Sequence, residues 1–128
     1  MQYEYFYGAQ AEQFSFYRIP KALFTVPNFR ELSTDAKVLY GILLDRMSLS
    51  LKNQWLDAQN KVYIIFTVEE IMDALNCANQ KATRLMVELE KRAGLIERKR
   101  QGLGRPNLIY VKNFAATIND KSCEKGDS

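Results

Sequence analysis

Two helical patterns separated by a four-residue break constrain the fold of this chain more than any other feature of its sequence. Apolar residues spaced for one buried helix face predict a helix over 67–75 and another over 80–92. Asn-Cys-Ala-Asn at 76–79 separates them, and Gly94 follows the second at a position where glycine commonly ends helices. This spacing predicts a helix-turn-helix. The residues expected to face inward are Val68, Ile71, Met72, Leu75, Ala82, Leu85, Met86 and Leu89.

A hairpin pattern follows the helix pair directly. Leu95 and Ile96 lead into the alternating polar run Glu-Arg-Lys-Arg-Gln at 97–101, and residues 108–111 form a second short apolar run. Gly-Leu-Gly-Arg-Pro-Asn at 102–107 joins them and has the composition of a turn. A β-hairpin directly after a helix-turn-helix is a wing, so the sequence predicts an α+β fold of the winged helix-turn-helix type.

A longer helix is predicted upstream, over 33–49, with Ser33 or Thr34 able to cap its start. Val-Tyr-Ile-Ile-Phe at 62–66 is β-branched and aromatic, which predicts a short strand. Thr67 and Glu70 then stand in the relation of a capping box. The fold thus has three main helices. The inward residues expected in the longest helix are Ala36, Leu39, Tyr40, Leu43, Leu44 and Met47.

The length of 128 residues fits one domain, which we divide into three parts. Residues 33–114 are expected to form the winged helix. Residues 1–32 are expected to form an N-terminal arm, a candidate for dimerisation. Residues 115–128 are polar, charged and without periodicity, so we expect a flexible linker towards a missing C-terminal domain.

The arm holds about half of the aromatic residues of the chain. Aromatic side chains dominate both protein cores and subunit interfaces. The arm therefore either folds back on its own core, together with Phe24 and Phe29, or packs against a second subunit. The aromatic residues in question are Tyr3, Tyr5, Phe6, Tyr7, Phe14, Phe16 and Tyr17.

Basic residues are concentrated in one stretch. Residues 77–114 hold nine Lys or Arg against three acidic residues, whereas residues 1–76 hold seven against nine. A local basic excess is the electrostatic footprint expected of a nucleic-acid-binding face. A solvated lysine-rich surface is the alternative.

Histidine is absent, which removes the commonest general base, the commonest zinc ligand and every Ser/His or Cys/His pair. Glu69, Glu70 and Asp73 lie in a predicted helix whose amino-terminal half favours acidic residues. Cys77 and Cys123 have neither metal-ligand nor disulfide-framework spacing, so we expect free thiols. We therefore expect no enzyme, no metal and no cofactor.

The chain also lacks signals for a membrane or for export. No apolar run approaches the roughly 20 residues of a membrane span, and the N-terminus has no secretory signal pattern. We expect a cytoplasmic protein with no membrane partner.

Polar residues near the start of the 80–92 helix are predicted to read DNA bases, because this end of a recognition helix usually enters the major groove. Amide side chains can pair with adenine, Arg or Lys with guanine, and the Thr methyl group with the thymine methyl group. An ordinary solvent-facing surface is the alternative for this stretch. The predicted recognition residues are Asn79, Gln80, Lys81, Thr83 and Arg84.

The wing is predicted to contact phosphates or to enter the minor groove, because its turn is flanked by basic residues. Charges on exposed edge strands also prevent aggregation, which is the alternative for Arg98 and Arg100. Trp55 is expected to pack under the loop between the first helix and the first strand, and not to touch DNA. The predicted wing residues are Arg98, Lys99, Arg100, Arg105 and Asn107.

Several segments between 14 and 114 carry a family resemblance. They read Phe-Ser-Phe-Tyr-Arg-Ile-Pro-Lys-Ala-Leu-Phe at 14–24, Leu-Ser-Thr-Asp-Ala-Lys-Val-Leu-Tyr at 32–40, Leu-Asp-Arg-Met-Ser-Leu-Ser at 44–50, Asn-Gln-Trp at 53–55, Val-Tyr-Ile-Ile-Phe-Thr at 62–67 and Gly-Leu-Ile-Glu-Arg at 94–98. The chain resembles the N-terminal domain of RepA-type plasmid replication initiators from low-GC Gram-positive bacteria. The opening Phe-Tyr-x-Ile-Pro-Lys joined to Asp-Arg-x-x-Leu-Ser is the specific part, since a winged helix alone matches many regulators.

The resemblance implies sequence-specific binding of double-stranded DNA at origin repeats, or iterons, to initiate plasmid replication. It also implies a homodimer and host replication proteins that bind a separate C-terminal domain. Two alternatives share the fold: a transcriptional regulator, which would normally carry an effector-binding or long dimerisation segment, and a winged helix that binds proteins, which would expose an apolar face.

Overall fold

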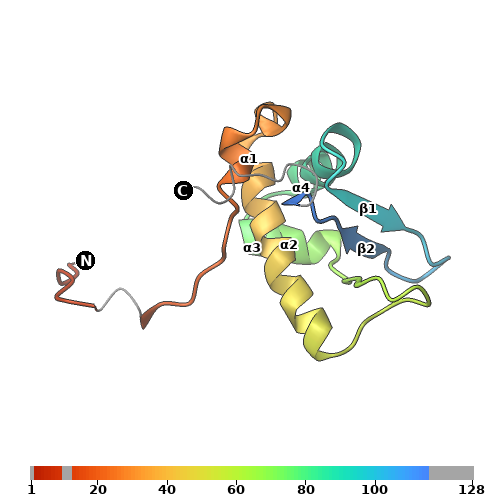
Figure 1. Cartoon of the computed structure of the whole chain (residues 1–128), viewed down its shortest axis with the longest axis horizontal. Helices are drawn as coiled ribbons and strands as arrows, with labels where there is room; N and C mark the ends of the chain where they lie inside the picture. The colour runs from red at the N-terminus through yellow and green to blue at the C-terminus, as the bar shows by residue number, and fades with distance from the viewer. Residues whose placement is uncertain (1, 10–12, 116–128) are drawn as a thin grey trace.

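The structure is a computed structural model that describes residues 2–9 and 13–115. Its longest helix, α2, runs through the body, and a two-stranded wing lies on the side opposite the N-terminal arm (Figure 1). The α+β winged helix-turn-helix is thereby confirmed. In chain order the elements are α1 (Ala22–Thr25), η2 (Pro27–Phe29), α2 (Thr34–Lys52), α3 (Val68–Leu75), α4 (Asn79–Val87), η3 (Glu88–Arg92), β1 (Ile96–Lys99) and β2 (Leu108–Val111).

Helix α2 is the central element of the core. Ser33 caps it, because its hydroxyl oxygen accepts a 3.1 Å hydrogen bond from the Ala36 backbone N–H. The predicted inward residues Leu39 and Leu43 are fully buried, while Leu44 and Met47 pack at the edge of the core. The helix ends at Lys52, three residues later than the periodicity predicts.

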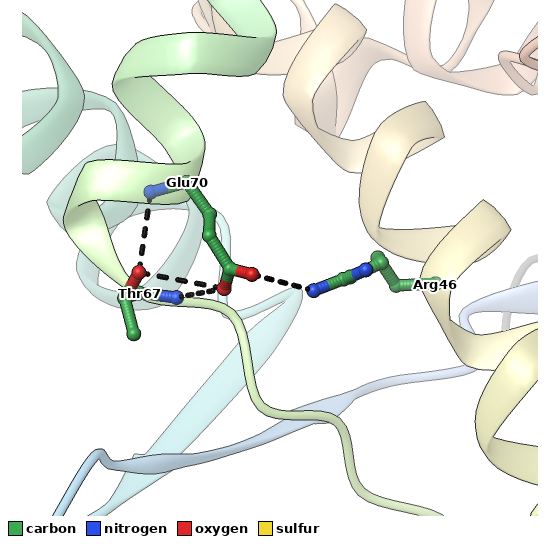
Figure 2. Close-up of polar contacts among 3 residues, drawn as sticks. All are labelled: Arg46, Thr67 and Glu70. Carbon is green, nitrogen blue, oxygen red and sulfur yellow. Dashed lines mark hydrogen bonds and ion pairs between the residues drawn. The ribbon is translucent and has the colours of Figure 1, made fainter.

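The helix-turn-helix is confirmed by α3 and α4. The capping box at the start of α3 is present, and Figure 2 shows Glu70 between Thr67 and Arg46 of α2. Glu70 accepts a 2.9 Å hydrogen bond from the Thr67 backbone N–H and forms a 3.0 Å ion pair with Arg46. The same carboxylate therefore caps α3 and ties its start to α2. Asn76 makes the turn with a left-handed φ of 55°.

Helix α4 passes directly into η3, a π-helical turn, and the two together span the predicted helix. Gly94 ends it with φ 67°, as its position predicts. Beyond Gly94, the Leu95 backbone N–H donates a 2.8 Å hydrogen bond to the Leu89 carbonyl oxygen. Because the chain reverses at Gly94, β1 packs against the helix that precedes it.

The wing is an antiparallel pair in which Ile96 is opposite Val111 and Lys99 is opposite Leu108. The predicted strand over 62–66 is wrong: only isolated β-bridges form there, between Leu56 and Val62 and between Ile64 and Ile109. The reason is that neighbouring residues of this segment pair with different partners. The Tyr63 backbone N–H donates to the Trp55 carbonyl oxygen in its own loop, whereas the backbone of Ile64 pairs with that of Ile109 in the wing. Neither pairing continues for long enough to make a strand.

Trp55 lies in the loop between α2 and residue 62 and stacks on Tyr63, with ring centroids 6.2 Å apart. Asp57 tightens this loop by accepting hydrogen bonds from the backbone N–H groups of Gln59 and Lys61. The Tyr110 hydroxyl of β2 donates to the same carboxylate over 2.9 Å. Trp55 thus stacks on Tyr63 within its loop but stays 37% exposed, and the loop is joined to the wing by the hydrogen bond of Tyr110.

The N-terminal segment divides into a buried base and an exposed arm. Although residues 19–32 are grouped with the arm on sequence, Leu23, Phe29 and Leu32 are buried in the core. At Arg18 and Ile19, where the arm joins this base, the chain crosses α2 closely at Gly41, and an added Cβ there would lie 2.9 Å from the Arg18 carbonyl oxygen. Glycine is required there because any side chain would collide with backbone.

The arm itself does not fold back on the core. Its aromatic side chains are between 52% and 82% exposed. Contacts within the arm include the Phe6 and Phe14 rings, whose centroids are 5.9 Å apart, and those of Phe14 and Phe16, 6.3 Å apart. In this structure the aromatic side chains of the arm therefore do not enter the core, and packing between subunits stays a prediction.

No helix within residues 2–9 and 13–115 is long and apolar enough to cross a lipid bilayer. Cys77 is a half-buried free thiol, as expected. Cys123 and nearly all of the predicted linker lie outside the described residues.

Tyr40 ties α2 to the chain after β2, and its burial raises the pKa of the phenol to about 12. Its hydroxyl donates a 2.8 Å hydrogen bond to the Lys112 carbonyl oxygen. Because the folded chain holds this proton more tightly than the unfolded chain, the stabilisation is complete below pH 10 and is lost as pH rises towards 12. Tyr40→Phe should cost about 0.5–1.5 kcal/mol at neutral pH.

Urea unfolding of both proteins at neutral pH and between pH 10 and 12 checks this expectation. The wild type should lose more stability than Tyr40→Phe over the alkaline range, so that their difference shrinks. A constant difference across the range would contradict the assignment.

Candidate nucleic-acid interface

One face of α4 is left uncovered by the core. Ala82, Leu85 and Met86 are buried, so the opposite side of the helix is exposed. Three predicted recognition residues, Gln80, Thr83 and Arg84, lie on this exposed side. Their side chains form a polar stripe open to solvent.

Val87 belongs to the same stripe and was not predicted. It lies four residues after Thr83 and three after Arg84, and it is 40% exposed. Its spacing from Thr83 was the available signal, since positions i and i+4 share a helix face. An exposed methyl-bearing side chain suits contact with a thymine methyl group.

The other two predicted helix residues lie at the edges of the stripe. Lys81 points to α2, where its ammonium group forms a 2.6 Å ion pair with Asp35. Both side chains are about half exposed, so this ion pair contributes little stability. Asn79 lies at the opposite edge, towards the wing.

A shallow hollow of about 420 Å³ lies between the start of α4 and the wing. Asn79 lines it together with Arg98, Arg105 and Asn107, so the structure brings one predicted helix residue and three predicted wing residues to one place. Glu69 at the start of α3 also contributes to the wall. The remaining lining residues are Phe66, Thr67, Val68, Ile71, Met86, Pro106 and Ile109.

Arg98 is occupied by a contact that the sequence does not reveal. Its Nε donates a 2.8 Å hydrogen bond to Glu90 of η3, and its backbone N–H donates over 3.1 Å to the same carboxylate. Burial alone would raise the pKa of Glu90, but the hydrogen bonds and charge of Arg98 outweigh it and lower the pKa. The pair therefore connects η3 to the base of the wing.

The outer part of the wing carries exposed cations. Lys99, Arg100 and Arg105 are exposed, and Asn107 is exposed beside them. The turn between the strands is closed by a 2.7 Å hydrogen bond from the Gln101 side chain to the Pro106 carbonyl oxygen. Because this hydrogen bond closes the turn, the hairpin holds the backbone positions of these cations fixed relative to one another.

Together, an exposed polar helix stripe and a basic hairpin beside it define a winged-helix domain of the kind found in DNA-binding proteins. Residues 15–125 match the family described as the N-terminus of replication initiator protein A (RepA). The chain belongs to this family.

A curated relative, a 41 kDa protein of Lactobacillus helveticus, is 32% identical over 103 residues. The match covers 80% of this chain and 28% of that relative, so the chain spans little more than a quarter of its length.

Solved structures are more similar still. One described as the N-terminal domain of a DNA-binding protein has a TM-score of 0.72 and 39% identity, covering 88% of this chain and 85% of that one. A Rep–DNA complex has a TM-score of 0.71 and 39% identity, covering 86% and 84%. An MDR initiator has a TM-score of 0.69 and 40% identity, covering 86% of each chain.

Proposed function

We propose that this domain binds double-stranded DNA at repeated origin sites, as the DNA-recognising part of a plasmid replication initiator. The observation that carries the proposal is the hollow where Asn79 of the recognition helix meets Arg105 and Asn107 of the wing. A duplex whose major groove receives α4 would have its backbone beside this wing. The family and the Rep–DNA complex of the same fold support this reading.

Base readout is assigned to α4. Gln80, Thr83 and Arg84 face the major groove, with Asn79 at the wing side of the stripe. Lys81 reaches a phosphate by exchanging its Asp35 partner for the DNA backbone, since an exposed ion pair is easily exchanged.

Phosphate contact is assigned to the wing, through Lys99, Arg100, Arg105 and Asn107. Arg98 was also predicted to contact DNA, but its guanidinium group lies on Glu90. Its proposed role is to hold the wing at the angle that the other cations need.

The wider assembly extends the same proposal. The exposed aromatic arm supports packing between subunits, and repeated DNA sites suit a homodimer. Host replication proteins would bind a C-terminal domain, consistent with the greater length of the curated relative. A binding role without catalysis fits a chain that contains no histidine, and the family of replication initiators fits a protein of the cytoplasm.

Fluorescence anisotropy with a direct-repeat duplex from the coding region of the protein, and a scrambled duplex of equal length, tests the proposal at two salt concentrations. We expect tighter binding to the repeat and a steep loss of affinity with salt, because phosphate contacts release counterions. Equal binding to both duplexes would contradict site recognition. No binding at low salt would instead favour a winged helix that binds protein.

A further inference from the structure

The tip of the wing presents a leucine to solvent. Leu103 is 100% exposed. It stands between Gly102, with φ 123°, and Gly104, with φ 78°. Apart from the chain neighbours of each glycine, no atom lies within 4 Å of where a Cβ on Gly102 or Gly104 would be, so no other segment packs against the tip there.

The turn holds this leucine in place. The Arg105 backbone N–H donates a 3.2 Å hydrogen bond to the Gly102 carbonyl oxygen, directly across Leu103. The Gln101 side chain bonds to Pro106 just below it. Leu103 makes no contribution to the core from this position, whereas burying a leucine is worth about 1.5–3 kcal/mol.

The surroundings of Leu103 suit DNA better than a protein surface. Arg100 and Arg105 are exposed close to it along the hairpin. Within the described part of the wing, Leu103 is the only large hydrophobic side chain that is exposed, whereas a protein interface is built on an apolar patch. A narrow apolar tip between cations is the arrangement by which minor-groove proteins part stacked bases.

We propose that Leu103 is an apolar wedge that enters the minor groove and partly unstacks one base step while the neighbouring arginines hold the phosphates. This rests on the proposed function and adds to it a residue that deforms the DNA. Pyrimidine–purine steps unstack most easily, so the wedge would favour sites with such a step under the wing. Leu103 would thus select sequence through DNA flexibility.

The experiment compares the wild-type chain with Leu103→Ser, Leu103→Phe and a control, Leu51→Ser, in which a half-exposed leucine of α2 is changed. The repeat duplex carries 2-aminopurine at successive steps, and a second copy carries a dye at each end to report bending. Wild-type binding should raise 2-aminopurine fluorescence at one step and bring the ends closer.

Leu103→Ser should abolish both signals and lower affinity about tenfold, because it loses the burial of the leucine and the added protein contacts that a bent duplex permits. Leu103→Phe should keep both signals, and Leu51→Ser should match the wild type. Wild-type binding without unstacking, or unchanged signals in Leu103→Ser, would overturn the wedge alone. A wild type that binds no duplex would overturn the proposed function as well.

Discussion

Replacing Arg84 by alanine should reduce discrimination between cognate and scrambled duplexes by about 1–3 kcal/mol, roughly 5- to 150-fold. Arg84 is exposed on the α4 stripe, and no ion pair joins it to another residue in the described part of the chain. Its guanidinium group is therefore available for the bidentate contact that arginine makes with guanine. Affinity for the scrambled duplex should change much less.

Arg105→Ala is the matched comparison, because it removes the same charge from the wing. It should weaken cognate and scrambled binding by similar factors and reduce the slope of affinity against salt by about one phosphate contact. Both variants are measured by anisotropy on both duplexes. If Arg84→Ala and Arg105→Ala behaved alike, the division between base readout and phosphate contact would be wrong.

Removing the Glu90 carboxylate should give the largest loss of stability among the polar contacts of this interface. Glu90→Ala leaves the Arg98 side chain, which is only 24% exposed, without its partner. An unsatisfied, partly buried polar group costs about 1–3 kcal/mol, and more when it is charged. Chemical denaturation should show this loss, and hydrogen exchange should show faster opening at the Arg98 backbone amide.

Glu97→Ala is the control for this variant, since Glu97 is exposed on the same strand and should change stability by less than about 0.5 kcal/mol. A double-mutant cycle with Arg98→Ala then isolates the coupling. Additive effects of Glu90→Ala and Arg98→Ala would contradict a direct contact. The lowered pKa of Glu90 also sets the direction of the pH dependence. The contribution of Glu90 to the free energy of unfolding is present above the ordinary carboxylate pKa and is lost as pH falls through the lowered pKa.

The same variants separate two roles for Arg98. If Arg98 positions the wing, Glu90→Ala and Arg98→Ala should weaken DNA binding by comparable amounts. A direct phosphate contact predicts that only Arg98→Ala weakens binding, because loss of Glu90 would free a cation for the DNA.

Features that depend on neighbouring residues could be predicted from the sequence. The capping box of Thr67 and Glu70, the cap by Ser33 and the reversal at Gly94 each involve residues within a few positions of one another. Helix periodicity identified the buried side of α4 for a similar reason, because side chains three and four apart share a face. The fold class followed from these local signals in their order along the chain.

The conformation of residues 62–66 could not be predicted correctly, because it depends on a distant partner. Ile64 forms its β-bridge with Ile109, which lies 45 residues later in the sequence. β-propensity describes a pleated, half-buried surface and does not specify the partner. In the folded chain the segment pairs partly with its own loop and partly with the wing.

The sequence by itself determined the winged-helix order, the basic excess after residue 77 and the residue types that α4 exposes. Only the tertiary structure decided which of the predicted DNA-contacting cations form ion pairs within the protein. Lys81 pairs with Asp35, and Arg98 pairs with Glu90. The tertiary structure also placed Leu103 fully in solvent at the wing tip. The physical reason is the separation along the sequence of the residues involved. Helix caps and periodicity involve residues within about one helical turn, whereas ion pairs and side-chain exposure depend on which distant segments pack together in the folded chain.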